Sequence, residues 1–307
     1  MKYIIKRVLL IIPVLILVSI VVFLIIHMIP GDPAEIIAGP GVPQSDIENI
    51  RRSMNLDKPL VTQYFIWANK ILHGDIGISL TNRTPILPLI VQRFRNTVFL
   101  TVFGIVFATI IGIPFGIVSA IKQNSVFDIL VMIISIIGIS MPIFWIGLLL
   151  MLFFSVNLRI LPATGSGSFQ HLILPGITIG MNSLAIIARM TRSSMLEVLR
   201  LDYIRTAESK GLPDRVIIIK HALKNALIPI VTIIGVQFGY LLGGAVLTET
   251  VFLYPGLGRL LVDSIKRRDY PVIQACIIFI ATIFIILNLI VDLTYMYLDP
   301  KIRYEKN

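Results

Sequence analysis

The sequence predicts an all-α, multi-pass membrane protein with about six transmembrane helices. The chain has 307 residues, of which 56% are hydrophobic and only 14% charged, and its mean hydropathy is +0.89. This is not the composition of a soluble globular protein. Apolar runs of about 20 residues, the length a helix needs to cross the hydrocarbon core, recur along the chain. We place them at residues 8–29, 98–121, 129–156, 172–190, 227–248 and 272–296.

The first apolar run follows a basic start that contains Lys2, Lys6 and Arg7. A cleaved signal peptide also begins with a basic region, but its apolar core is shorter and leads to a small-residue cleavage site. The first run is too long for that and leads instead into the sequence HMIPGDP. We therefore expect residues 1–30 to form a cytoplasmic tip and a retained first transmembrane helix.

The positive charges indicate the orientation of the helices. With the N-terminus in the cytoplasm, fifteen of the 27 Lys and Arg residues fall in cytoplasmic segments, five in short outer loops and seven in one long outer loop. Short cytoplasmic loops carry such an excess, whereas long translocated loops follow the rule weakly. Membrane topology thus explains the net charge of +10, and we expect lipid around the helices and no nucleic-acid partner. An even number of helices returns the C-terminal tail, residues 297–307, to the cytoplasm.

Residues 31–97 form the one sizeable insertion, which this topology places outside the membrane. Its stretch LVTQYFIWANKIL has apolar residues at the spacing of one helix face, which predicts an amphipathic helix. The residues of that face are Val61, Tyr64, Phe65, Ala68, Ile71 and Leu72. Two interpretations are open: the face closes a small local core, or it meets an external partner or the membrane interface.

The sequence contains no motif typical of an enzyme or a metal site. Its histidines, His27, His73, His171 and His221, are scattered, and neither HExxH, GxSxG nor GxxxxGK[ST] occurs. We therefore expect a non-enzymatic chain that binds no metal and no cofactor itself, so ATP-driven transport would require a separate ATPase chain. Cys276 is the only cysteine, which excludes an intrachain disulfide.

Two acidic residues, Glu249 and Asp292, lie near the ends of predicted spans. A charge within a membrane is costly unless it is paired or hydrated, and is therefore a functional hypothesis by default. Position at a helix end explains both residues. The alternative class is an ion-coupled secondary carrier that uses one of them, although the inverted repeat typical of such carriers is absent.

Polar and small residues in or beside the spans are candidates for lining a translocation path. They are Asn182, Ser183, Gln237, Gly239 and Gln274. Gly239 also lies between Gly235 and Gly243 in two overlapping GxxxG steps, a pattern typical of closely packed membrane helices. Helix packing and interhelical hydrogen bonds explain these residues as well as a path does.

The longest predicted cytoplasmic loop, residues 191–226, has a helical pattern. Asp202 and Arg205, and Arg205 and Glu208, have the i, i+3 spacing of stabilising pairs. A lysine followed by Gly211 suits a helix end, and a proline followed by Asp214 suits the first turn of a second helix. The pattern predicts a helix, a sharp turn and a helix, which is either a solvated connector or a docking surface for a cytoplasmic partner.

The same stretch resembles a known family. The sequences RTAESKGL and KHALKNALIPIVT are similar to the cytoplasmic EAA loop of ABC-importer permeases in the dipeptide, oligopeptide and nickel branch. Further similar segments span nearly the whole chain, including IPGDPA, GDIGIS, ISMPIFWIG, ETVFLYPGLGRLLVDSI and VDLTYMYLDPKIRY. Arg205, Thr206 and Ala207 align with the three-residue EAA start.

The resemblance implies a type I ABC-importer permease fold with a transmembrane core at residues 98–296. It implies an ATPase-coupling loop with Tyr203, Arg205, Thr206, Ala207, Glu208, Gly211 and Leu212. The implied partners are a second homologous permease subunit, two cytoplasmic ATPase subunits that carry ATP and magnesium, and an extracytoplasmic substrate-binding protein. The implied location is the bacterial or archaeal cytoplasmic membrane.

The implied function is the import of dipeptides or oligopeptides, with nickel or a metal chelate as the alternative cargo. Two other classes remain distinct from it. An ion-coupled carrier would transport without ATPase subunits, and a membrane receptor or scaffold would not transport at all.

Overall fold

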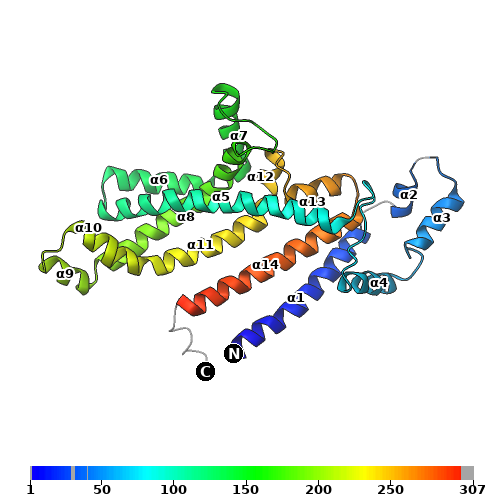
Figure 1. Ribbon diagram of the computed structural model, residues 1–307, viewed down its shortest axis with the longest axis horizontal. Coiled ribbons are helices and arrows are strands. Elements are labelled where there is room, and N and C mark those ends of the chain that lie inside the picture. The colour runs from blue at the N-terminus through cyan, green and yellow to red at the C-terminus, as the bar shows by residue number, and fades with distance from the viewer. Residues whose placement is uncertain (1, 29–31, 40, 299–307) are drawn as a thin grey trace. The chain divides into compact units, whose positions relative to one another are not determined.

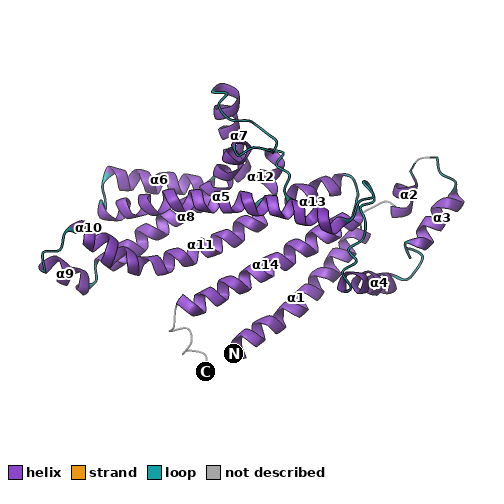
Figure 2. Cartoon of the chain, viewed as in Figure 1, coloured by secondary structure: helices purple, strands orange, loops and turns teal. Residues whose placement is uncertain are grey.

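The computed structural model describes residues 2–28, 32–39 and 41–298 (Figure 1). Over these residues the chain is helical, with turns and loops between the helices and a single isolated β-bridge between Ile78 and Pro85 (Figure 2). The chain divides into two compact units. The first comprises Met1–Arg95 and Arg259–Ile286, and the second comprises Asn96–Gly258 and Leu287–Asn307. Two long helices, α5 (Ile86–Ile121) and α14 (Tyr270–Leu298), contribute residues to both.

The first unit is built around the pair of apolar helices α1 and α14. Helix α1 spans Lys2–His27, and the unit also contains α2 (Pro33–Ala38), α3 (Gln44–Ser53), α4 (Leu60–Leu72) and most of α13 (Leu257–Lys266). Val22 of α1 packs on Tyr270 and Ile273 of α14 in a buried cluster. The two helices therefore lie side by side within this unit (Figure 1).

A hairpin-like loop of the first unit is fixed to the start of α14 by one carboxylate. The Ser79 hydroxyl donates to Oδ2 of Asp269 at 2.5 Å, and the backbone N–H of Leu80 donates to Oδ1 at 3.1 Å. Asp269 is 3% exposed and Ser79 is 1% exposed. A buried carboxylate that accepts several hydrogen bonds is well compensated, so this contact orders the loop that follows α4.

The second unit surrounds α8 (Gln170–Leu199), which packs against α6, α7 and α11. Its other helical segments are α6 (Val126–Ser140), α7 (Ile143–Leu150), η1 (Met151–Asn157), α9 (Asp202–Ser209), α10 (Asp214–Val216), η2 (Ile217–Leu223), α11 (Lys224–Gly244) and α12 (Val246–Val251). The segments η1 and η2 are π-helical. Fourteen of the 30 residues of α8 are buried, which makes it the central helix of this unit.

Glycines allow α5 and α8 to pack closely. A Cβ atom built on Gly116 would lie 2.5 Å from the carbonyl oxygen of Ala188, and one built on Gly180 would lie 2.5 Å from that of Gly104. A side chain there would force the backbones apart. For the GxxxG steps of α11 the sequence left close packing and a translocation path open; nothing lies within 4 Å of a Cβ built on Gly239, one of their three glycines. Among the glycines that the structure describes, those of α5 and α8 thus bring the backbones of two long helices together.

Over the described residues, all six predicted apolar runs fall on helices, but several of these helices are bent or have other ends than predicted. Among the described residues, four helical segments are long and apolar enough to cross a membrane: Ile86–Ile121, Gln170–Leu199, Asp214–Gly244 and Tyr270–Ile290. The third predicted run is not one straight helix but a pair, Val126–Ser140 and Ile143–Asn157, bent by 109°. Pro142 lacks an N–H group and disfavours helical backbone at the preceding residue, which explains the break. The first run lies on α1, whose described apolar stretch is Leu9–Ile25.

The other changes concern helix ends. The second run was predicted to begin at residue 98, but α5 begins at Ile86. The fourth run was predicted to end at residue 190, but α8 continues for more than two further turns, to Leu199. The fifth was predicted to continue to residue 248, but α11 ends at Gly244 and the short helix α12 follows.

Candidate functional site: the α9 turn

The polar connection between α8 and α11 folds as a short helix followed by a tight turn, which we call the α9 turn (residues 201–213). The helix begins after Leu201, whose backbone is extended, and ends at Ser209, with Lys210 as its C-cap. Gly211 then has φ +71°, a left-handed conformation that favours glycine. The N–H of Gly211 donates to the carbonyl of Glu208 at 2.9 Å, and the N–H of Leu212 donates to that of Ala207 at 3.4 Å. The predicted helix, turn and helix are therefore present, with α10 starting at Asp214.

One face of α9 is buried and holds the turn in place. Ile204 is 1% exposed and Ala207 is 6% exposed. They share a hydrophobic cluster with Met195 and Val198 of α8, Ile217 and Ala222 of η2, and Ala226 and Ile230 of α11. Burial of these apolar side chains supplies most of the stability of so short a helix. The α9 turn is thus tied to both of the long helices that it joins.

The opposite face of α9 is a polar surface. Arg205, Thr206, Glu208 and Gly211 are exposed. The carboxylate of Asp202 lies 3.7 Å from the guanidinium of Arg205, and both side chains are well exposed, so this pair contributes little to stability. The predicted ion pair between Arg205 and Glu208 is not formed in this part of the described chain. These groups are available for contact with another molecule.

Tyr203 connects α9 to the helix that follows. Nδ2 of Asn225 donates to its hydroxyl oxygen at 2.6 Å, and the hydroxyl donates to the carbonyl of His221 at 3.3 Å. His221 lies in η2, and π-helical turns of this kind are frequent at functional sites. The seven predicted coupling residues thus divide into two groups. Ala207 and the partly buried Leu212 support the turn from inside, and the other five lie at its surface.

The predicted path residues are only partly brought together. Nε2 of Gln237 in α11 donates to the hydroxyl of Ser183 in α8 at 3.3 Å, and both residues are buried. Asn182 and Gly239 belong to the same unit, at half-buried and buried positions. The one contact that forms is an interhelical hydrogen bond. The sequence left two interpretations of these residues open, interhelical hydrogen bonding and a translocation path, and this contact is of the first kind.

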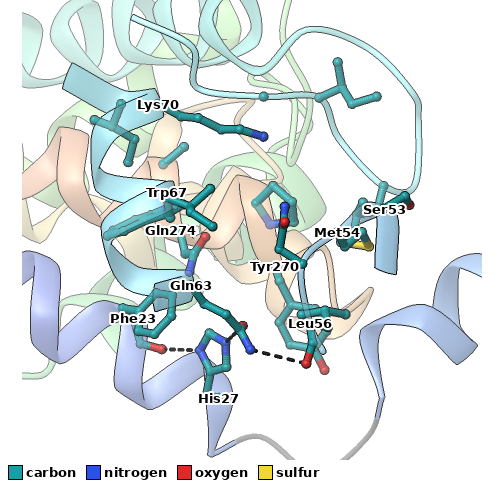
Figure 3. Close-up of a pocket in the computed structure, with 18 of the residues that line it drawn as sticks. Phe23, His27, Ser53, Met54, Leu56, Gln63, Trp67, Lys70, Tyr270 and Gln274 are labelled. Atoms are coloured by element: carbon teal, nitrogen blue, oxygen red, sulfur yellow. Dashed lines mark hydrogen bonds between the residues drawn. The ribbon is translucent and has the colours of Figure 1, made fainter. Parts of the chain in front are cut away.

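Gln274 belongs to the first unit, where it lines a cavity of about 930 Å³ (Figure 3). The wall includes residues of α1, α3, α4 and the start of α14. Nε2 of His27 lies 3.1 Å from Oε1 of Gln63, whose Nε2 donates to the carbonyl of Leu56 at 3.3 Å. Tyr270 is 5% exposed, and its hydroxyl has no hydrogen-bond partner within the described chain. No group of three or more His, Cys, Asp or Glu side chains that could hold a metal ion occurs among the described residues.

Sequence reasoning missed a buried ion pair in the second unit. Nε and Nη2 of Arg192 in α8 donate to the two carboxylate oxygens of Asp128 in α6 at 2.6 and 2.7 Å. The hydroxyl of Ser119 in α5 and the backbone N–H of Asn124 also donate to this carboxylate. The sequence does contain a signal for this pair. Asp128 directly precedes the third predicted apolar run, and Arg192, of opposite charge, lies just after the fourth. The prediction placed both residues outside the membrane spans.

Glu249 was interpreted as a helix-end group and is instead fully buried in α12. Its Oε1 accepts a hydrogen bond from the hydroxyl of Thr97 at 2.6 Å, and that hydroxyl oxygen accepts one from the N–H of Leu257 at 2.9 Å. The residue therefore organises the segment between α12 and α13. The side chain of Asp292, the other predicted acid, lies outside the described part of the structure.

Two family models together match almost the whole chain. The binding-protein-dependent transport system inner membrane component matches residues 112–304, and its N-terminal membrane component matches residues 1–101. The chain belongs to this family. It is therefore a permease subunit of an ABC importer, and the predicted type I importer fold is confirmed.

Curated relatives match the permease along its full length. It is 47% identical over 305 residues to the glutathione transport system permease protein GsiC of Escherichia coli, with 99% of this chain and 100% of the relative covered. It is 48% identical over 332 aligned positions to the dipeptide transport system permease protein DppB of Alkalihalophilus pseudofirmus, with the same coverage.

Solved structures show the same fold at much lower identity. A chain of the MetNI methionine ABC transporter, in an inward-facing conformation, matches with a TM-score of 0.60 at 19% identity and covers 70% of the permease and 98% of that chain. A chain of an amino acid ABC transporter solved with histidines matches with a TM-score of 0.56 at 13% identity, covering 69% and 94%. At these identities the match bears on the fold alone.

Proposed function

We propose that this permease imports short peptides across the bacterial or archaeal cytoplasmic membrane, with both termini in the cytoplasm. Two relatives at 47–48% identity, matched over their entire length, are named for a tripeptide and for dipeptides. The excess of Lys and Arg in the segments that this topology places inside supports the orientation.

We further propose that the α9 turn is the surface on which a separate ATPase subunit docks. The observation that carries this proposal is the contrast between the two faces of α9. Arg205, Thr206 and Glu208 are exposed on one face, while Ile204 and Ala207 are buried on the other. The chain has no phosphate-binding GxxxxGK[ST] loop, so the energy source is assigned to another polypeptide that binds ATP and magnesium.

The packing of α9 provides a direct mechanical connection to the transmembrane helices. A partner that displaces the exposed face moves Ile204 and Ala207, which contact side chains of α8, η2 and α11 in one buried cluster. Packed interiors transmit displacement because they have few voids. Movement of the ATPases would therefore shift α8 and α11 as a unit, which is the change that alternating access requires. The remaining proposed partners are a second permease subunit and an external substrate-binding protein.

Replacement of Gly211 by valine tests the docking role. A β-branched residue at φ +71° costs about 1–2 kcal/mol of backbone strain, although nothing lies within 4 Å of the added Cβ. We expect ATP-dependent peptide uptake in proteoliposomes to fall about tenfold, since about 1.4 kcal/mol corresponds to a factor of ten. Membrane insertion should be unchanged.

Gly41→Val is the matched control. Gly41 has φ +83°, is exposed, and also has open space around its added Cβ, but it lies between α2 and α3. Uptake should be retained in this variant. Normal uptake with normal ATPase stimulation in Gly211→Val would refute the docking role. Uptake of nickel instead of peptides by the intact complex would refute the substrate.

A further inference from the structure

Helix α4 does not bury the apolar face that its sequence presents. Tyr64 is partly buried and contacts α1, where its hydroxyl lies 2.8 Å from that of Ser19 and its ring 5.5 Å from that of Phe23. Val61, Phe65 and Leu72 remain 68%, 65% and 84% exposed. The sequence left two interpretations of this face open. The structure divides it into a stripe that packs on α1 and a second stripe that nothing in the described chain covers.

We propose that this second stripe, Val61, Phe65 and Leu72, inserts into the acyl chains of the outer membrane leaflet, so that α4 lies in the membrane interface. Three features of the contact between α4 and α1 carry the proposal: the direction in which α4 crosses α1, the depth at which they meet, and the way α4 is rotated about its own axis.

The contacts show that α4 crosses α1 instead of running along it. On α1 they extend from Ser19 to His27, which is about 12 Å at 1.5 Å per residue. On α4 the hydrogen bonds and ring contacts to the described part of α1 extend from Gln63 to Trp67. Two aligned helices would advance together along both chains. Because α1 is an apolar membrane helix, a helix that crosses it lies closer to the membrane plane than to the membrane normal.

The contacts also fix the depth of α4. The described apolar stretch of α1 is Leu9–Ile25, and Phe23, which contacts both Tyr64 and Trp67, lies inside it. Ser19 lies another turn closer to the middle of α1. Helix α4 therefore meets α1 at the level of the outer acyl chains. Interfacial helices bury their apolar face to about 5–10 Å into this region.

The rotation of α4 directs the apolar stripe toward the middle of the bilayer. Gln63 contacts His27 at the end of α1, whereas the next residue, Tyr64, contacts Ser19 eight positions deeper. Each residue of a helix is rotated by about 100° from the one before it. Viewed along the axis of α4, the three stripe residues therefore lie about 60–100° from Tyr64, on the side away from Gln63.

Lys70 lies about 120° from Tyr64 on the opposite side, beside Gln63. Figure 3 shows Gln63, Trp67 and Lys70 along the side of α4 that borders the cavity. Lys70 therefore faces the same side as Gln63, toward the end of α1 at His27. The apolar stripe faces the other side, toward the level of Ser19. Helix α4 thus has an apolar side that fits lipid and a charged side that fits water, as expected for a helix at the membrane surface.

Collision measurements on nitroxide labels test the proposal in the full-length permease, co-expressed with its partner subunits and held in nanodiscs of phosphatidylcholine and phosphatidylglycerol. Labels are attached to Phe65→Cys, Leu72→Cys and Val61→Cys in a Cys276→Ala background. Thr62→Cys and Lys70→Cys, on exposed polar positions of the same helix, are the matched controls. All five side chains are exposed on the surface of the chain, so folding is not at risk.

We expect labels on the stripe to collide several times more often with oxygen, which partitions into lipid, than with a water-soluble nickel chelate. The two control positions should show the reverse. Low collision rates with both agents at positions 61, 65 and 72 would show that a protein subunit covers the stripe and would overturn the proposal. Frequent collision with the nickel chelate would overturn it as well, because the stripe would then face water.

Discussion

At the scale of single residues, Asp128 and Arg192 form an ion pair that is largely buried between α6 and α8. Arg192 lies in the part of α8 beyond the predicted span, and its guanidinium binds Asp128 through two hydrogen bonds. The carboxylate is 2% exposed and the Arg192 side chain 22% exposed. An unpaired charge in a buried environment has a high free-energy cost. Because Asp128 and Arg192 neutralise each other, α8 can continue past Arg192 in such an environment.

We expect Asp128→Asn to destabilise the permease by about 3 kcal/mol, because it leaves a largely buried guanidinium without its counter-ion. Thermal unfolding of the purified protein in detergent measures the change. Asp202→Asn is the control, since it removes an exposed pair that contributes less than about 1 kcal/mol. Equal effects of the two substitutions would show that the buried pair has no special role.

A second ion pair, outside the membrane spans, predicts a pH dependence. Burial of the Asp32 carboxylate tends to raise its pKa, but hydrogen bonds from Arg51 and from the N–H of Ala34 outweigh this, so its pKa lies below the ordinary value of 3.8. A lowered pKa stabilises the fold at pH values above the unfolded-state pKa. That stabilisation is lost as the pH falls through the folded-state value.

Hydrogen exchange at matched pH should detect this effect. At pH 7 we expect Asp32→Asn to increase exchange in α2 and α3 relative to the wild type, because the ion pair and the cap on Ala34 are weakened. At pH 2.5, where Asp32 is increasingly protonated, the difference should shrink. A difference that is the same at both pH values would contradict the assignment.

At the scale of helices, close packing depends on which glycines face a neighbour. Gly116 of α5 faces the backbone of α8. Gly239 of α11 is also buried, but a Cβ atom added to it would have no neighbouring atom within 4 Å. Sequence spacing alone does not separate the two, since Gly112 and Gly116 form a GxxxG step just as Gly235 and Gly239 do. The difference arises from the rotation of each helix about its axis.

Gly116→Ala should therefore destabilise the permease by about 1–3 kcal/mol, the usual range for overpacking. Gly239→Ala should leave stability within about 0.5 kcal/mol or raise it slightly, since alanine is the better helix former. Thermal unfolding of both variants in one detergent gives the comparison. A larger loss from Gly239→Ala would mean that the two glycines have been assigned the wrong roles.

At the scale of the whole molecule, the permease is one component of a larger transporter. We expect the purified chain to hydrolyse no ATP above background, and uptake to require added ATPase subunits, binding protein and ATP. A proton or sodium gradient without ATP should drive no uptake into proteoliposomes. Uptake driven by such a gradient would favour the ion-coupled carrier, for which Glu249 is a candidate.

Much of this architecture is encoded locally and was predictable from the sequence. Long apolar runs predicted the membrane helices, because a helix in lipid must be apolar over its own length. Lys210, Gly211, Pro213 and Asp214 predicted the end of one helix and the start of the next, because capping depends on neighbouring residues. The family motifs predicted the type of transporter. Each of these signals lies within a continuous segment of the sequence.

Only the tertiary structure decided which distant residues meet. It paired Asp128 with Arg192, buried Glu249 beside Thr97, and gave the glycine contact to α5 and α8. It also divided the apolar face of α4 into a packed and an exposed stripe. Periodicity shows that a helix has a face but not what covers it. Contacts between distant segments depend on how each helix is rotated and crossed by its neighbours, which is fixed only when the helices pack.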